Sequence, residues 1–294
     1  METRYLETLL TVFETSSLAE TARRHNLTPS TVAQRIRALE QEIGQKLIAR
    51  AGHAVKPTAA GSAIMAEARR MIAVESDLKA AASAKLGVGL LRVGVIQTAL
   101  SSLMPDVLIG LKKRHPGLEA YLIPGVSVDL YNALLAGELD LAVLIRPHFA
   151  VPKSLEWLLL REEHMVLLTP KTLKGVDTDN ILKTEAFIRY DRNHWGGRIV
   201  DQYLRRKKIH PKEQFELDSL EAITVLVGRG LGVAIIPQLP PPWPYGADVR
   251  KLSLADAPLR KVGILWPKGS TRLPLIKNFV AEFRARPDSQ HLRQ

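Results

Sequence analysis

The apolar positions of the first sixty residues predict a small bundle of short helices. Two helical stretches flank a tight polar turn, and their apolar residues recur at the spacing that holds two crossing helices together: Ala19, Ala22, Leu27, Val32, Ile36, Leu39 and Ile43. A further helix from Tyr5 to Thr15 covers them. Thr28 is a favourable N-cap, and Pro29 follows where its missing N–H is tolerated. The pattern predicts a helix-turn-helix, with an ordinary small helical bundle as the alternative.

The outward face of the second helix carries hydrogen-bonding side chains and a cation: Ser30, Thr31, Gln34 and Arg37. Short polar side chains near a helix N-terminus reach base edges, and neighbouring cations meet phosphates. Between Thr21 and Thr58 the chain has seven Lys or Arg against two acids, a local balance of +5. This face is therefore a candidate surface for contact with double-stranded DNA.

The stretch KLIARAGHAVKPT predicts a short hairpin after the helices. Gly52 lies at the turn, the apolar residues flank it, and the outward residues are Arg50, His53 and Lys56. A ribbon of this kind, a wing, can lie along a minor groove or a phosphate ridge. The alternative is a plain connecting loop.

Residues 59–86 predict one long helix, because no proline interrupts them and apolar residues recur at helical steps: Ile64, Ala68, Met71, Leu78 and Ala82. Such a helix spans roughly 40 Å, which is too long for the small domain before it to cover. We expect its partner to be a second copy of the chain, and packing back on the same chain is the alternative. Gly87 and Gly89 then mark a hinge.

The remaining residues alternate between strand and helix patterns. Strands are predicted at 90–97, 118–123, 139–145, 186–190, 214–218, 232–237 and 260–266, with helices at 100–115, 127–136, 199–207, 219–227 and 275–284. Asp218 and Glu221 have the spacing of a capping box. This alternation predicts two α/β lobes, each with a mostly parallel sheet and helices on its faces.

Composition narrows the classes of function. With 294 residues, 46% of them hydrophobic, the chain can bury a sizeable core in two or three domains. Its net charge of +11 favours a polyanion or acidic small molecules as partners. The absence of cysteine excludes disulfides, thiol nucleophiles and cysteine-ligated zinc. We see neither an export leader nor a membrane span of roughly 20 apolar residues, and we expect a cytoplasmic protein without membrane contact.

Enzyme motifs are missing from the sequence. Neither a zinc HExxH, a GxSxG elbow nor a P-loop occurs, and the glycines at 228–232 follow a helix and precede a strand, the reverse of a dinucleotide fingerprint. His164 stands beside Glu162 and Glu163, but side chains alternate between faces along a strand, so we expect no joint acid–base role. We expect no enzyme, cofactor or metal site. An enzyme on this two-lobed fold remains an alternative.

The chain resembles the LysR-type transcriptional regulators nearly from end to end. The segments that carry the resemblance are SSLAETARRHNLTPSTVAQRIRALEQEIG, PTAAG, LRVGV, GELDLAVLIRP and DSLEAITVLVGRGLGVAIIP. The resemblance implies an α/β chain with an N-terminal all-α winged helix-turn-helix. A long linker helix pairs two subunits and leads to a two-lobed effector domain like the periplasmic binding proteins. It implies a homo-oligomer, a dimer or tetramer. A solute-binding protein whose N-terminal helices serve only for association is a further alternative.

Carried over residue by residue, the resemblance assigns DNA contacts to two groups. The start of the base-reading helix falls on Pro29, Ser30, Thr31 and Gln34. Many members have glutamine where this chain has Pro29, which lacks a side-chain donor, so the preferred operator is expected to differ. Arg35 and Arg37 match positions that face the DNA backbone, and Arg50 matches the wing arginine.

The resemblance also implies an effector site between the lobes, with these residues: Thr98, Ser101, Ser102, Ser127, Arg146, Arg192 and His194. Helix N-termini attract anions, and Arg146 adds a full charge with bidentate geometry, so we expect a small organic anion. The alternatives are that the serines only cap helices, that Arg146 forms a surface ion pair, and that His194 and Trp195 are packing residues.

The residue pattern and the family resemblance together predict the organisation of the chain. Residues 1–58 form the DNA-binding domain, 59–86 the linker helix, 87–161 with 265–294 the first lobe, and 162–264 the second lobe, with crossings near Leu160 to Met165 and Gly263 to Trp266. We expect an effector-controlled regulator that binds an inverted repeat with half-sites about one helical turn apart, or a multiple of it. RNA polymerase is a candidate partner.

Overall fold

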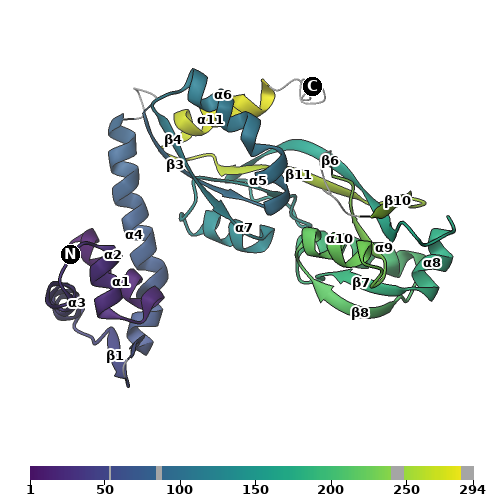
Figure 1. Ribbon diagram of the computed structural model, residues 1–294. Coiled ribbons are helices and arrows are strands. Elements are labelled where there is room, and N and C mark those ends of the chain that lie inside the picture. The colour runs from purple at the N-terminus through teal and green to yellow at the C-terminus, as the bar shows by residue number, and fades with distance from the viewer. Residues whose placement is uncertain (53, 84–87, 240–247, 286–294) are drawn as a thin grey trace.

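The computed structural model describes residues 1–52, 54–83, 88–239 and 248–285. It contains an N-terminal helical domain, a long helix, and two α/β lobes that follow one another along the molecule (Figure 1). The expected fold class is confirmed.

The N-terminal domain is a three-helix bundle with a hairpin. Helices α1 (Thr3–Thr15), α2 (Leu18–Arg24) and α3 (Pro29–Ile43) enclose a core that includes Leu9, Val32 and Leu39. Thr28 caps α3 as expected, since its side chain accepts a hydrogen bond from the Thr31 amide. Strands β1 (Ile48–Ala51) and β2 (Ala54–Pro57) pair antiparallel and form the expected wing.

Helix α4 (Ala59–Ser83) stands as a straight rod between this domain and the first lobe (Figure 1). Its first half packs against α1, because Ala68 is buried and Ile64 and Ile72 are partly buried in the core of the N-terminal domain. Met71, Val74 and Leu78 are exposed. Residues 84–86 of the expected linker helix lie outside the described residues.

The first lobe has a sheet in which β3 (Gly89–Val95) lies between β4 (Leu118–Pro124) and β5 (Leu141–Ile145), all parallel. Helix α7 (Ser127–Leu135) follows β4, and the terminal helix α11 (Leu273–Arg284) packs beside α6 (Met104–Arg114). The single helix expected at 100–115 is two helices, α5 (Gln97–Ser102) and α6 (Met104–Arg114). The break coincides with Pro105, whose ring is tolerated only in the first turn of a helix.

The second lobe contains α8 (Thr178–Thr184), β7 (Ala186–Tyr190), α9 (Trp195–Lys207), β8 (Lys212–Leu217), α10 (Leu220–Gly228), β9 (Ala234–Pro237) and β10 (Val249–Ser253). Helix α9 begins four residues before the expected start. Ser219, and not Asp218, caps α10: its Oγ accepts the Ala222 amide at 3.2 Å. The expected capping box is wrong, because the cap needs the residue directly before the first helical turn.

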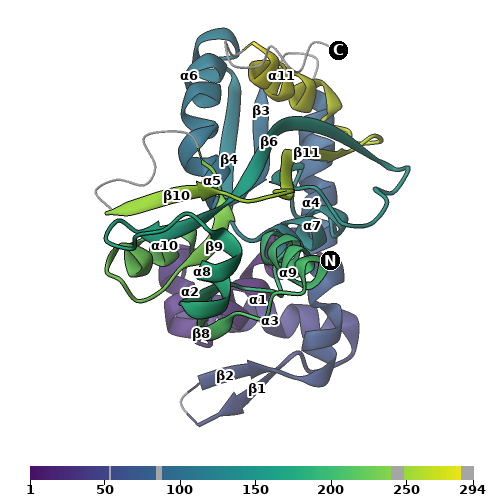
Figure 2. The same ribbon diagram turned by 90° about the vertical axis from the view of Figure 1, so that its right-hand side faces the viewer.

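Two strands join the lobes. The long β6 (Leu155–Pro170) pairs with β11 (Leu259–Pro267) in the first lobe and continues to pair with β9 and β10 in the second. Both views show it running through both lobes (Figure 2). The second crossing lies at the start of β11, because Leu259 and Arg260 pair with β6 near the junction and Val262–Leu265 already pair with β5 in the first lobe. It was expected at Gly263 to Trp266, so the boundary moves to about Leu259; strand patterns show where a strand lies but not which sheet it joins.

Candidate nucleic-acid interface and interlobe pocket

The N-terminal half of α3 presents an open polar face. Pro29, Ser30 and Gln34 are exposed and Thr31 is half-buried. The Thr28 hydroxyl lies 2.8 Å from the hydroxyls of both Ser30 and Thr31, so the cap also orients the two side chains beside it. This face has the position and chemistry of a helix that reads base edges in a major groove.

The two arginines of α3 differ in what they contact. Arg37 is exposed. Arg35 folds back on α1, where its Nη1 donates to the Thr8 hydroxyl at 3.1 Å and its guanidinium lies 5.8 Å from the centre of the Tyr5 ring. Arg35 therefore ties two helices together, and Arg37 is the better candidate for a phosphate contact.

The wing is anchored by a buried carboxylate. Glu40 on α3 accepts the Leu47 amide at 2.9 Å and the Ile48 amide at 3.4 Å, and it pairs with Lys46 at 2.7 Å. Burial opposes ionisation, but these hydrogen bonds outweigh it and lower the pKa of Glu40. Glu40 thus holds the first strand of the wing against α3.

The wing cations lie on opposite faces. Arg50 is opposite Val55 and Lys56 is opposite Ala49, and neighbouring residues of a strand alternate between faces. Both cations are exposed, so each has access to solvent on its own side of the ribbon. His53 lies outside the described residues.

The structure separates the residues expected at one effector site. Thr98 and Ser102 on α5 accept hydrogen bonds from Arg260 and Arg161, at 3.0 and 3.2 Å. Ser101 is exposed, and its hydroxyl bonds to the carbonyls of its own helix.

Ser127 and Arg192 have partners within their own lobes. The buried Ser127 hydroxyl accepts the Ile145 amide at 3.1 Å, which couples the start of α7 to the end of β5. Arg192 pairs with Glu213 and Glu216 on β8, and its hydrogen bonds lower the pKa of Glu216. Half-buried His194 has its Nε2 3.8 Å from the Asp191 carboxylate.

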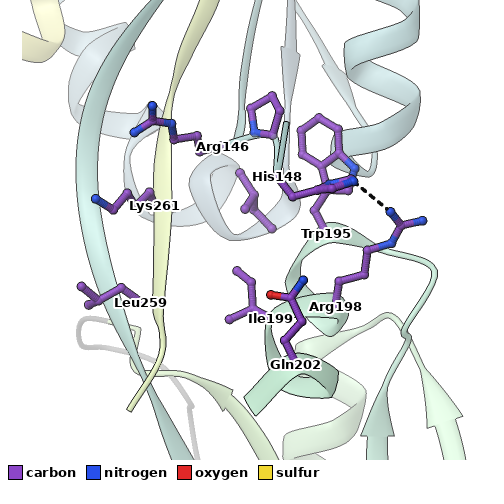
Figure 3. A pocket seen from close by; sticks show the side chains of 10 residues that line it. Arg146, His148, Trp195, Arg198, Ile199, Gln202, Leu259 and Lys261 are labelled. Carbon is purple, nitrogen blue, oxygen red and sulfur yellow. Dashed lines mark hydrogen bonds between the residues drawn. The ribbon is translucent and has the colours of Figure 1, made fainter. Parts of the chain in front are cut away.

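A basic pocket lies between the lobes, with a volume of about 180 Å³. The first lobe supplies Ile145, Arg146, Pro147 and His148, α9 supplies Trp195, Arg198, Ile199 and Gln202, and β11 supplies Leu259 and Lys261. Arg198 Nη1 and His148 Nε2 are 3.2 Å apart and connect the two lobes (Figure 3). Lys261 pairs with Glu162 at 3.0 Å. The cations and the apolar walls suit a small anion with an apolar body.

Trp195 connects the two lobes beside this pocket. It belongs to the second lobe but packs in the core of the first, with its ring 5.7 Å from Tyr131 and 5.8 Å from Phe149. Two residues after Trp195, glycine is required for a steric reason: a Cβ on Gly197 would lie 1.8 Å from the Asp191 carbonyl oxygen. Of the pocket cations, Arg146 was expected from the sequence, whereas Arg198 and Lys261 were not, and Gln202 was not expected either. The Trp-Gly-Gly at the start of α9 was the available signal.

In the part of the chain that is described, no helix is long and apolar enough to cross a membrane. The same residues contain no group of three or more His, Asp or Glu side chains arranged to hold a metal ion.

Comparison with known proteins agrees with this geometry. Residues 3–62 match the bacterial regulatory helix-turn-helix protein, lysR family, and residues 84–288 match the LysR substrate binding domain. The chain is 27% identical over 296 residues to the uncharacterized HTH-type transcriptional regulator YnfL of Escherichia coli K12, which covers 95% of this chain and 96% of that protein. The chain therefore belongs to the LysR family of DNA-binding transcriptional regulators with a substrate-binding domain.

Two solved structures share the fold. Full-length CbnR, complexed with its target DNA, has a TM-score of 0.72 at 20% identity and covers 97% of this chain and 99% of its own. The effector binding domain of QuiR, in complex with shikimate, has a TM-score of 0.59 at 18% identity and covers 67% of this chain and 95% of its own.

Proposed function

We propose that this chain is a ligand-controlled regulator, in which a small organic anion bound between the lobes adjusts how paired winged helix-turn-helix domains hold duplex DNA. The observation that carries the proposal is the pocket that both lobes line with cations, Arg146 and Arg198 among them. A ligand that touches both lobes has an affinity that depends on their arrangement, and only such a difference lets binding shift an equilibrium.

Four observations support the DNA-binding half of the proposal. Ser30 and Gln34 on the outward face of α3 are exposed and Thr31 is half-buried, Arg37 stands beside them, and the wing carries Arg50 and Lys56. A relative, CbnR, has been solved with its target DNA. We place base contacts on Ser30, Thr31 and Gln34, with an inverted-repeat operator read by a dimer or tetramer. We propose a cytoplasmic location, because a regulator of this kind must have access to DNA.

Dimer formation rests on the exposed apolar stripe of α4. Met71, Val74 and Leu78 are 41%, 53% and 69% exposed and lie at three- and four-residue steps. A stripe at this spacing on a long helix is buried when a second helix packs along it. We infer that the second helix comes from another copy of this chain.

The effector class follows from the pocket. Three cations line the pocket: Arg146, Arg198 and Lys261. Glu162 balances the charge of Lys261, and the remaining walls are largely apolar. The small volume favours a compact organic anion, and shikimate in the QuiR effector domain supports a ligand of that size. The chain acts by binding and not by catalysis, in keeping with its family of regulators.

The test begins with selection of binding sites from a random duplex library, using the full-length protein. We expect an inverted repeat whose affinity falls steeply with salt. Organic acids are then screened by thermal shift, and each hit is used in footprinting with and without ligand. Arg198→Ala should raise the Kd of a hit at least tenfold, whereas Arg205→Ala, an exposed position on the same helix, should not.

Selection without enrichment over random duplex contradicts DNA control. A ligand that binds Arg198→Ala and Arg205→Ala equally contradicts the pocket, and a hit that leaves the footprint unchanged separates binding from regulation.

A further inference from the structure

A buried carboxylate is held by two arginines where the lobes meet. Glu163 on β6 and Arg260 on β11 are direct partners across the antiparallel pair, and each side chain is 1% exposed. Glu163 Oε2 accepts from Arg260 Nε at 2.5 Å, and Oε1 accepts from Arg161 Nε at 2.8 Å. In each arginine Nη2 also contacts the same oxygen as Nε. Both oxygens of one carboxylate are therefore occupied by guanidinium donors.

The same arginines reach into both lobes. Arg260 Nη2 donates to the Thr98 hydroxyl at 3.0 Å, and Arg161 Nη2 donates to the Ser102 hydroxyl at 3.2 Å. Tyr190 of the second lobe lies beside Arg260, and its burial raises the pKa of the Tyr190 phenol. The cluster joins α5, the two connecting strands and β7.

The arrangement has the chemistry of a ligand site. Paired N–H donors of arginine match the geometry of a carboxylate, and hydroxyls that hold the guanidinium groups fix that geometry. A buried ion pair contributes little net stability compared with apolar residues of the same volume, so stability alone is a weak reason for it. Two arginines face one carboxylate, which leaves an excess of one positive charge.

We propose that Arg161 and Arg260, positioned by Thr98 and Ser102, form a carboxylate-binding site between the lobes, and that the chain fills this site with its own Glu163. The ligand class is a small carboxylate, which enters once the Glu163 side chain is removed. Thr98 and Ser102 act on the site by holding Arg260 and Arg161 in place, since their hydroxyls accept hydrogen bonds from these two guanidinium groups.

This site is separate from the pocket of the proposed function. Leu259 and Lys261 line the pocket, and Arg260 between them points to the other face, because side chains alternate along β11. An effector in the pocket is thus held without Arg260, whose charge Glu163 already meets. The inference does not depend on DNA binding or on the identity of an effector.

The test is chemical rescue in the full-length protein. Glu163→Ala leaves the buried Arg260 and the partly buried Arg161 without their anion, so we expect the melting temperature to fall by roughly 5–10 °C. Sodium formate at about 50 mM should restore at least half of that loss, and sodium chloride at equal ionic strength should not. Formate is the probe because it carries a carboxylate and fits the volume that the glutamate side chain leaves.

The matched control is the neighbouring cross-strand pair. Glu162 lies opposite Lys261 and is 42% exposed, so Glu162→Ala should lower the melting temperature by less than about 2 °C and show no response specific to formate. A formate effect equal in Glu163→Ala, Glu162→Ala and the unaltered chain overturns the proposal, and so does the absence of any formate effect.

If Glu163→Ala does not fold in the absence of formate, the yield of refolding from urea tests the proposal instead. Formate in the refolding buffer should raise the folded yield several-fold over chloride, and an equal yield in both salts overturns the proposal. None of these measurements uses DNA, so a failed operator selection and a failed rescue are distinguishable.

Discussion

Gln34 and Arg37 lie three residues apart on the exposed face of α3, yet their chemistry assigns them different tasks. A side-chain amide reads the donors and acceptors of one base, whereas a guanidinium near the backbone neutralises phosphate wherever it binds. Arg35 was expected to share the second task. Its contacts with Thr8 and Tyr5 instead make it a residue that holds α3 on α1, a role that depends on a helix 27 residues earlier.

Gln34→Ala should cost about 1–3 kcal/mol of binding free energy on the selected operator and relax the preference at one base position, with binding to random duplex unchanged. Arg37→Ala should weaken binding to both duplexes and reduce the salt slope by about 1. Fluorescence anisotropy titrations over a range of salt concentrations measure both effects, with Gln214→Ala, exposed on β8, as the control. Equal losses on operator and random duplex for Gln34→Ala would remove it from base readout.

Glu40 gives the DNA-binding domain a pH dependence. Its pKa in the folded chain lies below the usual value of 4.5, so its stabilising effect is present above about pH 4.5 and is lost as pH falls through the folded pKa. Glu40→Gln should reduce the free energy of unfolding by about 1–3 kcal/mol at pH 7 and by less at pH 3.5. Calorimetry at the two pH values checks this, with Glu42→Gln, exposed on the same helix, as the control. The same loss at both pH values would show that ionised Glu40 does not anchor the wing.

At the scale of elements, α4 divides its apolar residues between two partners. The sequence pattern placed Ile64, Ala68, Met71 and Leu78 in one row facing a second copy. In the structure the early members pack on α1 of the same chain, and Met71 and Leu78 remain exposed. Packing on the same chain therefore accounts for the first half of the helix only, because a helix of 25 residues is longer than the small domain beside it. The exposed second half is the part that we propose pairs with a second copy.

Leu78→Glu should raise the dissociation constant of the dimer at least tenfold, because it buries a charge in the proposed helix pair. Sedimentation velocity over a concentration series measures this. Ala66 is also exposed on α4, but its side chain leaves the helix at about 120° around the axis from that of Leu78. Ala66→Glu should therefore leave association unchanged. A dimer as stable as the original would place the interface elsewhere.

At the scale of the whole molecule, the lobes are joined by β6, β11 and the packing of one tryptophan. Trp195 starts a helix of the second lobe and completes the core of the first. Arg198, one turn further along the same helix, brings its charge to His148 and the pocket. The contact between the lobes and the lining of the pocket thus both depend on the first turn of α9. A change in how the lobes meet therefore alters the pocket as well.

Trp195→Ala should lower the free energy of unfolding by about 3–5 kcal/mol and separate the melting of the two lobes into distinct transitions. Differential scanning calorimetry measures both. Phe149→Ala removes a ring that is 41% exposed and should lower the same free energy by less than about 1.5 kcal/mol. A single transition with a similar loss in both variants would mean that Trp195 does not couple the lobes.

The sequence by itself determined the helix-turn-helix with its Thr28 cap, the wing, the long helix and the alternation of strands and helices in two lobes. These features depend on residues within a few positions of one another, where periodicity, turns and caps leave a readable pattern. Their boundaries shifted by a few residues, Pro105 divided one expected helix, and α8 and β10 were not among the expected elements.

Only the tertiary structure decided which side chains meet. Thr98 and Arg146 were expected at one site, but one faces Arg260 and the other lines the pocket on the opposite face of β11. Glu163 and Arg260 are 97 residues apart and become partners only through the register of two strands. Long-range packing and charge pairing depend on which faces the sheets bury, and no local pattern records that choice.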